Sequence, residues 1–230
     1  MFLFGLDPLY FIMIIPVLLF SMWAQFRVKS SFNKYSRVRA RSGLTGAQAA
    51  AVLMERYGLS GITIARAGGL LSDHYSPTQR KLSLSDKVGN APSIAALGVA
   101  AHEVGHAVQH QKGLFIMRLW QALAVPVAFA GNAALWLIII GAFLSLTLAK
   151  VGFVLFLGVV AFQILTLPLE FDASRRAKQM LLASGVITPE EKAGVAAVLN
   201  NAALTYVAAA AVSLTQLLYF ALRLGIFGRR

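Results

Sequence analysis

Four long stretches without a charged residue dominate the pattern of hydrophobic and polar positions along the chain. They cover residues 8–26, 119–149, 151–169 and 193–222. About 20 apolar residues suffice to cross a hydrocarbon core about 30 Å thick as a helix. We therefore expect three to four transmembrane helices. The fourth stretch is the weakest candidate, and it can equally pack as a long helix against the rest of the protein, because polar residues interrupt it: Asn200, Asn201, Thr205 and Gln216.

The first stretch resembles a secretory signal peptide only in its hydrophobicity. Asp7 stands where such a peptide carries positive charge, and no small-residue cleavage site follows before Arg27. We therefore interpret this stretch as a retained membrane anchor. The second and third stretches are separated only by Lys150, which predicts a helical hairpin.

The segment between the first two stretches predicts a small folded domain over about residues 42–113. Thr45 and Gln48 have the spacing of a capping box at the start of a helix. Short strands are expected at residues 62–65 and 81–85, where β-branched and alternating residues lie between turn signals. The second strand can pair in an ordinary sheet or hold an extended peptide at an open sheet edge. Both interpretations remain open.

Residues 102–106, His-Glu-Val-Gly-His, form the pattern with the clearest chemistry. They lie inside an apolar segment that begins at the capping residue Ser93 and predicts a helix of about 18 residues. Positions four apart share one face of a helix, so His102 and His106 can bind the same metal ion. Glu103 then reaches a water molecule on that ion, as in the HExxH pattern. The sequence predicts a zinc site with Glu103 as the general base.

A catalytic zinc site needs a third protein ligand and an open fourth position. The chain has no cysteine, which excludes thiolate ligands and disulfides. His110 lies about 12 Å along the helix from His102. It is therefore expected at the helix end near the membrane, or in contact with a metal ligand, and not as a ligand itself. His74 is a possible ligand, but hydrogen bonding within its loop, residues 73–75, is the favoured interpretation.

Two carboxylates differ from the other acidic residues in their position. Glu170 and Asp172 follow directly on the third uncharged stretch, where an unpaired charge is costly and usually functional. Glu170 is therefore a candidate for the third ligand. The alternative is an interfacial anchor that pairs with Arg175 or Arg176.

The composition agrees with a membrane protein, since 58% of the residues are hydrophobic and 13% are charged. The net charge of +12 raises the question of nucleic-acid binding. The basic residues gather beside the uncharged stretches and lack the interleaved aromatic residues of a nucleic-acid surface. Anionic lipids are the favoured partner, and nucleic acid is excluded.

The flanking charges predict the orientation in the membrane. Six basic residues lie between residues 27 and 41, whereas Asp7 is the one charged residue before the first stretch. By the positive-inside rule the N-terminus lies outside and the following segment is cytoplasmic, which puts the active site at the cytoplasmic face. Arg175, Arg176 and Lys178 agree with this orientation. The fourth crossing stays open, because it would place three basic residues outside: Arg223, Arg229 and Arg230.

Residues 71–77, 100–110 and 169–177 resemble, in this order, three motifs of the YugP-type neutral zinc metallopeptidases of bacterial membranes. Residues 170–174 are more distantly similar to the ExxAD element of the HtpX-like and CAAX-processing membrane proteases. These resemblances imply Glu170 as the third zinc ligand and a location in the bacterial cell membrane. They also imply a carboxylate that orients a zinc-binding histidine, but the position of that carboxylate is occupied by Ser174. Either Asp172 or Ser174 itself is then expected to take this role.

The expected fold is a mainly α membrane protein with a zincin-like catalytic domain, a small β-sheet and three to four transmembrane helices. The expected function is a zinc endopeptidase that hydrolyses a peptide or membrane-protein substrate. Tyr206 is a weaker candidate for stabilising the oxyanion, and packing is favoured for it. The alternative function is a zinc-binding membrane scaffold or chaperone without hydrolytic activity. The natural substrate, the cleavage preference and the oligomeric state do not follow from the sequence.

Five regions are expected along the chain, each with one role. They are an N-terminal anchor with a basic juxtamembrane segment (1–41), the zincin-like domain (42–117), the transmembrane hairpin (118–169), a third-ligand helix with a cytoplasmic segment (170–201), and a C-terminal hydrophobic helix with a basic tail (202–230).

Overall fold

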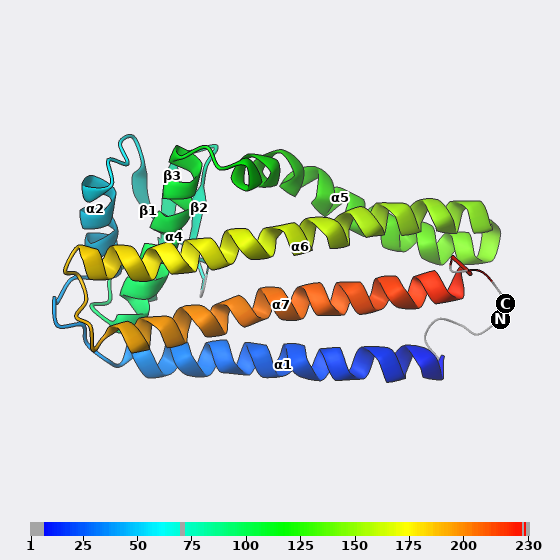
Figure 1. Ribbon diagram of the computed structural model, residues 1–230, viewed down its shortest axis with the longest axis horizontal. Coiled ribbons are helices and arrows are strands. Elements are labelled where there is room, and N and C mark those ends of the chain that lie inside the picture. Colours follow the sequence, from blue (N-terminus) through cyan, green and yellow to red (C-terminus); the bar gives the residue numbers. More distant parts are fainter. Residues whose placement is uncertain (1–6, 70–71, 227, 229–230) are drawn as a thin grey trace. The chain divides into compact units, whose positions relative to one another are not determined.

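The computed structural model describes residues 7–69, 72–226 and 228. Leu71, Arg229 and Arg230, which entered the sequence predictions, lie outside these ranges. Figure 1 shows the elements. In chain order they are α1 (Pro8–Ser36), α2 (Gly46–Arg56), β1 (Thr63–Ala67), β2 (His74–Ser76), β3 (Lys81–Ser85), α3 (Asp86–Gly89), α4 (Ile94–Gln111), α5 (Phe115–Leu144), α6 (Leu146–Ala183) and α7 (Lys192–Arg223). The predicted class, a mainly α protein with a small sheet, is confirmed.

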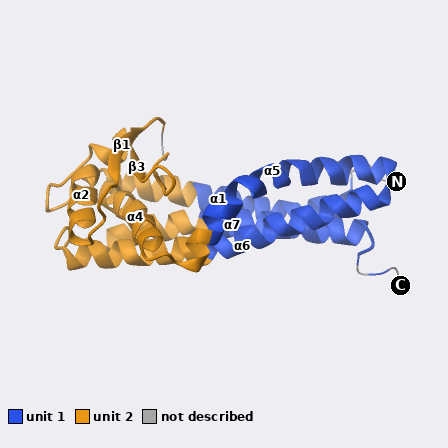
Figure 2. Ribbon diagram, turned by 90° about the horizontal axis from the view of Figure 1, so that it is seen from above, with its two compact units in different colours: residues 1–25, 119–167, 205–230 blue, residues 26–118, 168–204 orange. Residues whose placement is uncertain are grey.

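The chain divides into two compact units, and each draws on separate parts of the sequence (Figure 2). Unit 1 consists of residues 1–25, 119–167 and 205–230, and unit 2 of residues 26–118 and 168–204. Helix α6 contributes to both units, because it continues without a break past the end of the third uncharged stretch. All residues of the predicted zinc site fall in unit 2.

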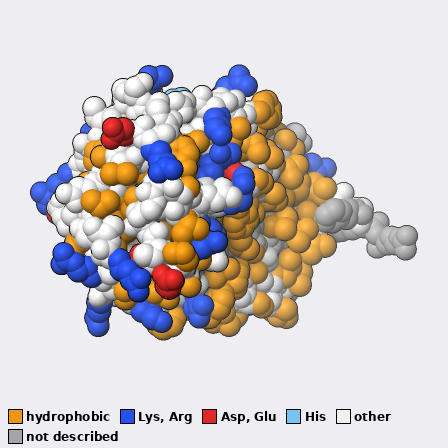
Figure 3. All heavy atoms as spheres, turned by 60° about the vertical axis from the view of Figure 1, so that its left-hand side comes forward, with side chains coloured by type: hydrophobic (Ala, Val, Ile, Leu, Met, Phe, Trp, Pro, Cys, Tyr) orange, Lys and Arg blue, Asp and Glu red, His pale blue; other side chains and the backbone are white. Residues whose placement is uncertain are grey.

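Four helices, α1, α5, α6 and α7, are long and apolar enough to span a membrane among the described residues. The fourth uncharged stretch, which forms α7, therefore qualifies by length and composition. Many large apolar side chains on these helices are exposed, as lipid-facing residues are; examples are Ile12, Phe129 and Leu144. Figure 3 shows a broad hydrophobic surface and, apart from it, a face where Lys and Arg side chains gather. The expected membrane protein is confirmed.

Helices α5 and α6 form the predicted hairpin in unit 1, but the chain reverses at Ser145 and not at Lys150. Two glycines explain the position of the turn. A Cβ atom on Gly141 would lie 2.3 Å from the backbone nitrogen of Ala149, and one on Gly152 would lie 2.8 Å from the carbonyl oxygen of Ala134. The two backbones are therefore in direct contact just beyond the turn, which an intervening side chain would prevent.

Unit 1 also brings the start of α1 to the end of α7. Asp7 is 2% exposed. Its Oδ2 atom accepts a hydrogen bond from the Tyr219 hydroxyl at 2.8 Å and forms an ion pair with Arg223. Its Oδ1 atom accepts one from the backbone N–H of Leu9 at 3.1 Å, which ties down the first turn of α1. The two helix ends therefore share one charged cluster.

Unit 2 contains a three-stranded sheet in the order β1-β3-β2 among its described residues. Strand β3 pairs parallel to β1 and antiparallel to β2. Residues 81–85 are paired with β1 along their whole length, and residues 81–83 also with β2, so of the two interpretations of this strand the structure supports the ordinary paired strand. Residues 74–76, expected in a loop, form the edge strand β2. Three residues are too short for a recognisable alternation, and their strand character comes from pairing with β3.

Helix α4 runs through the interior of unit 2 and confirms the predicted 18-residue helix. The Ser93 hydroxyl accepts a hydrogen bond from the backbone N–H of Ala96 at 3.2 Å, so the predicted capping residue caps the helix. The capping box of Thr45 and Gln48 at the start of α2 is also confirmed. Most α4 side chains are buried on all sides, which fixes the helix and its polar residues in place.

Candidate metal centre

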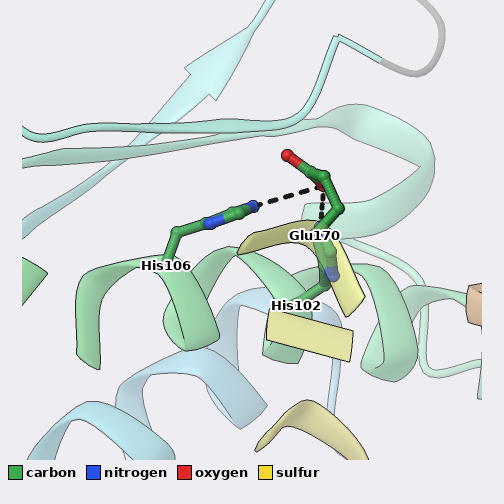
Figure 4. A group of neighbouring side chains, drawn as sticks. All are labelled: His102, His106 and Glu170. Carbon is green, nitrogen blue, oxygen red and sulfur yellow. Dashed lines mark ion pairs between the residues drawn. The ribbon is translucent and has the colours of Figure 1, made fainter. Parts of the chain in front are cut away.

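Three side chains from two helices converge in unit 2. His102 and His106 project from consecutive turns of α4, and Glu170 projects toward them from α6 (Figure 4). The Oε2 atom of Glu170 lies 3.3 Å from Nε2 of His102 and 3.7 Å from Nε2 of His106. One ligand atom from each residue lies within 4.8 Å of the others. The predicted ligands are thus brought together.

The spacing of these atoms fits a tetrahedral zinc site. Zinc binds histidine nitrogen and carboxylate oxygen at about 2.0–2.2 Å, which places neighbouring ligand atoms of a tetrahedron about 3.3–3.6 Å apart. Of the distances from Glu170 Oε2 to the two nitrogens, 3.3 Å lies in this range and 3.7 Å lies just above it. The two imidazole rings stand almost perpendicular, at 85°, so their nitrogens approach a common point from different directions.

The Glu170 carboxylate is buried, and one of its oxygens has no hydrogen-bond donor among the described residues. The residue is 8% exposed, and its Oε2 atom accepts no hydrogen bond from the described residues. The histidine nitrogens are within ion-pair distance of this oxygen, but their geometry does not make a hydrogen bond. A buried carboxylate oxygen without a donor is costly. A cation among the three atoms removes that cost, so the donor set fits a bound zinc ion.

The electrostatics at His106 point the same way. Burial lowers the pKa of this histidine, but the nearby Glu170 carboxylate and the negative charge of Glu103 outweigh burial and raise the pKa to about 9. The carboxylates therefore favour a positive charge at this position. A proton on His106 supplies that charge when no metal does.

Both histidines are held by the nitrogen that faces away from Glu170. The Ser174 hydroxyl lies 3.1 Å from Nδ1 of His102, so Ser174 takes the position that the resemblance assigned to an orienting carboxylate. Oε1 of Gln109 lies 2.9 Å from Nδ1 of His106. With Nδ1–H donating in both cases, each Nε2 lone pair is directed at the candidate metal position.

Asp172 contacts Gln109 and not a zinc-site histidine. The Gln109 amide donates hydrogen bonds of 2.9 Å to the carbonyl oxygen of Leu169 and to Oδ2 of Asp172. Asp172 in turn forms ion pairs with Arg175 and Arg176. The two arginines therefore pair with Asp172, and neither forms an ion pair with Glu170. This arrangement is contrary to the alternative in which Glu170 anchors an arginine.

A glycine allows α4 and α6 to approach this closely. A Cβ atom on Gly105 would lie 2.8 Å from the carbonyl oxygen of Ala173 and 3.2 Å from its Cα atom. Gly105 thus lets the two helix backbones meet beside the histidines. Gly105 and Gln109 were not singled out in the sequence. A glycine inside a metal-binding helix and a buried amide three positions after a ligand are the signals that could have revealed them.

Glu103 lies beside the group of three but is not part of it. It is 7% exposed, and its Oε2 atom accepts a hydrogen bond of 2.9 Å from the backbone N–H of Tyr75 in β2. The backbone of an edge strand thus holds the carboxylate in position. This arrangement suits a base next to the metal better than a metal ligand.

The remaining histidines have other contacts. His74 is exposed, and its Nδ1 atom lies 2.8 Å from the carbonyl oxygen of Ser72, the local hydrogen bonding that was favoured for it. Nδ1 of His110 lies 2.9 Å from the Tyr75 hydroxyl. Neither belongs to the group of three. Tyr206 is 42% exposed and falls in unit 1, so its role at the site stays a prediction.

Comparison with known proteins connects this geometry to a family. Residues 10–225 match a family described as "Putative neutral zinc metallopeptidase". The chain is also 47% identical over 213 residues to a Bacillus subtilis (strain 168) protein described as "Putative membrane protease YugP". That alignment covers 92% of this chain and 95% of the Bacillus protein. No solved structure matches the chain.

Proposed function

The chain belongs to this family of zinc metallopeptidases, and from that premise we propose that it is a membrane-embedded endopeptidase whose zinc ion is held by His102, His106 and Glu170. The observation that carries the proposal is the orphaned Oε2 atom of Glu170 between two imidazole nitrogens. The three ligands leave a fourth position open, as catalytic zinc sites do.

The residues around the metal have distinct roles in peptide hydrolysis. Zinc, when bound, polarises the substrate carbonyl and acidifies a water molecule. Glu103 accepts the proton of the attacking water and then delivers it to the leaving amine. The N–H of Tyr75 keeps the Glu103 carboxylate in place, so the base does not have to be ordered at each turnover.

Ser174 and Gln109 preserve the metal-binding tautomer of the two histidines. Each accepts an Nδ1–H, which leaves Nε2 without a proton and fixes the ring plane. Asp172 orients Gln109 through the amide nitrogen. The charge of Asp172 is balanced by its two arginines, so it does not compete with Glu170 for the metal.

We further propose that the active site faces the cytoplasm. Basic residues in segments 27–41 and 175–178 flank the parts of the chain that carry the site. The positive-inside rule puts these basic residues on the cytoplasmic side. Four crossings then return both termini to the outside. The pairing of Arg223 with Asp7 supports this topology. It joins the outer ends of α1 and α7 and neutralises one of the three cations that a fourth crossing places outside.

The proposed substrates are peptides or membrane proteins. An extended peptide that adds to the sheet would pair with β2, because β2 is an edge strand and its Tyr75 contacts Glu103. The basic residues beside the apolar stretches suit the headgroups of anionic lipids. The proposed location is the bacterial cell membrane.

One experiment separates the peptidase from a zinc-binding scaffold or chaperone. The purified protein in detergent is incubated with an unfolded membrane protein, once with zinc and once after treatment with a chelator. A peptidase produces new peptide termini only with zinc. Equal absence of cleavage in both samples, with one zinc ion bound per chain, would favour the scaffold.

A further inference from the structure

A cavity lies one helical turn beyond the metal centre in unit 2, with a volume of about 210 Å³. Its apolar wall consists of Leu59, Ile62 and Ala107. Its polar side includes Tyr75, Arg80 and His110, together with Ser60 and Gln111. This volume suits one side chain or chain end rather than a larger ligand, since sites for small molecules span about 300–1,000 Å³.

Tyr75 connects this cavity to the catalytic base. Its backbone N–H donates to Oε2 of Glu103 at 2.9 Å, while its hydroxyl lies 2.9 Å from Nδ1 of His110 in the cavity. Glu103, Ala107 and His110 lie at positions i, i+4 and i+7 of α4, which share one face of the helix. A peptide held at Glu103 along this face therefore has a side chain or a terminus within reach of the cavity.

The cavity is lined by an exposed cation, Arg80. Among the described residues Arg80 forms no ion pair, in contrast to Arg66, which pairs with Asp86. Burial lowers the pKa of His110, and the charge of Arg80 lowers it further, so the guanidinium acts on the polar end of the cavity. The cavity thus presents one permanent positive charge.

The backbone at Arg80 is held in an unfavourable conformation. Its φ of 48° lies in the left-handed region, and it is the one residue other than glycine with positive φ in the part of the chain that the structure describes. Its N–H donates to the carbonyl oxygen of Pro77, and its own carbonyl accepts from Thr63 at 3.1 Å. Such conformations are strained and are concentrated at functional sites. The turn therefore fixes the backbone position of Arg80, from which its side chain extends.

From these observations we infer that the cavity of Tyr75, Arg80 and His110 is a substrate subsite that recognises a carboxylate of the peptide. The inference rests on the proposed peptidase function and makes it more specific. Arg80 is the principal partner, since a guanidinium forms two parallel hydrogen bonds with a carboxylate. The Tyr75 hydroxyl and the His110 ring add polar contacts, and the apolar wall encloses the stem of the side chain. The carboxylate belongs either to an Asp or Glu side chain or to the C-terminus of the peptide.

Hydrolysis of a defined peptide set tests the subsite and separates these two sources. In the first set one Glu moves through every position of a neutral peptide with an amidated C-terminus, and each member has a Gln counterpart. In the second set neutral peptides carry a free or an amidated C-terminus. The enzyme is the full-length protein with zinc in detergent. One Glu position or a free C-terminus should raise kcat/KM by about 10- to 100-fold, because hydrogen bonds to charged groups contribute that much.

The variant Arg80→Asn should abolish this preference while cleavage of neutral peptides continues. Asparagine tolerates the left-handed backbone that Arg80 adopts, so the fold is retained. Arg80→Lys should preserve part of the preference, since it keeps the charge but not the two parallel hydrogen bonds. The matched control is Lys112→Asn, which removes an exposed cation that does not line the cavity; it should preserve the preference in full.

Peptide binding by zinc-loaded Glu103→Gln protein, followed by fluorescence anisotropy, tests the subsite independently of turnover. The same carboxylate should strengthen binding, and the additional change Arg80→Asn should cancel the gain. A preference that survives Arg80→Asn, or its absence from every peptide, would overturn the subsite. If no peptide were cleaved but the Arg80-dependent gain in binding remained, the peptidase proposal would fall and the carboxylate site would stand.

Discussion

Nε2 of His102 lies 3.3 Å from Oε2 of Glu170, although the two residues come from different helices, α4 and α6. No hydrogen bond from the described residues reaches that oxygen. A cation between α4 and α6 therefore satisfies the carboxylate and joins the helices through their side chains. Binding of the metal and the packing of these helices are expected to depend on each other.

Glu170→Gln should abolish stoichiometric zinc binding while the protein stays folded. The change preserves the shape of the side chain but removes the negative charge among the three ligand atoms. Metal analysis of the purified protein, together with circular dichroism, measures both outcomes. Glu55→Gln, which alters an exposed carboxylate on α2, is the matched control and should retain zinc. Unchanged metal content in Glu170→Gln would refute Glu170 as the third ligand.

Gln109→Ala should weaken zinc binding by about 10- to 100-fold, the usual effect of removing a partner that orients a metal-binding histidine. The change frees Nδ1 of His106 and also removes the hydrogen bonds to Leu169 and Asp172. Competition with a chelator of known affinity measures the loss. Gln79→Ala, at an exposed glutamine outside α4, should bind zinc like the original protein. An affinity unchanged by Gln109→Ala would mean that His106 is oriented by its packing alone.

Gly105→Ala should destabilise unit 2 by about 1–3 kcal/mol, the usual cost of forcing an extra methyl group into a packed interior. The new Cβ would meet the backbone of Ala173 at 2.8 Å, so α4 and α6 must separate and zinc binding should weaken. Thermal unfolding and metal content report the two effects. Gly158→Ala in α6 is the control, since a Cβ there meets nothing within 4 Å. Equal stability of the two variants would contradict the close approach of the helices.

Zinc affinity should rise with pH up to about 9 and level off above it. In the metal-free protein the pKa of His106 is raised to about 9, so this histidine carries a proton at neutral pH. Zinc binds the neutral imidazole, and the proton must leave. Each unit of pH below 9 therefore costs up to about tenfold in apparent affinity. Titrations in metal-buffered detergent solutions between pH 6.5 and 9.5 measure this slope. A flat profile would show that His106 binds no proton in the metal-free state.

Local signals allowed most of α4 to be predicted from the sequence. Ser93 caps the helix as expected, because a hydroxyl before an apolar run satisfies the first free N–H groups. The spacing of His102 and His106 placed both rings on one face. Glu170 was identified as a candidate by its position at the edge of an apolar stretch, where an unpaired charge is costly and usually functional.

Features that depend on contacts between distant segments were missed. Gln109 gained its role only because Gly105 lets α6 bring Leu169 and Asp172 to it. Strand β2 has too few residues for a pattern of its own. The hairpin turns at Ser145, where Gly141 lets the two backbones meet, and Lys150 lies in the first turns of α6.

The central claim, that Glu103 is the base of a zinc peptidase, is tested most directly by Glu103→Gln. Zinc content and peptide cleavage are measured on the same purified sample. Because glutamine cannot accept a proton but preserves the side-chain shape and the acceptor for the Tyr75 N–H, one zinc ion per chain should remain. The cleavage rate should fall by about 10²- to 10⁴-fold, the usual contribution of a general base. A variant that kept both its zinc and its full cleavage rate would contradict the mechanism.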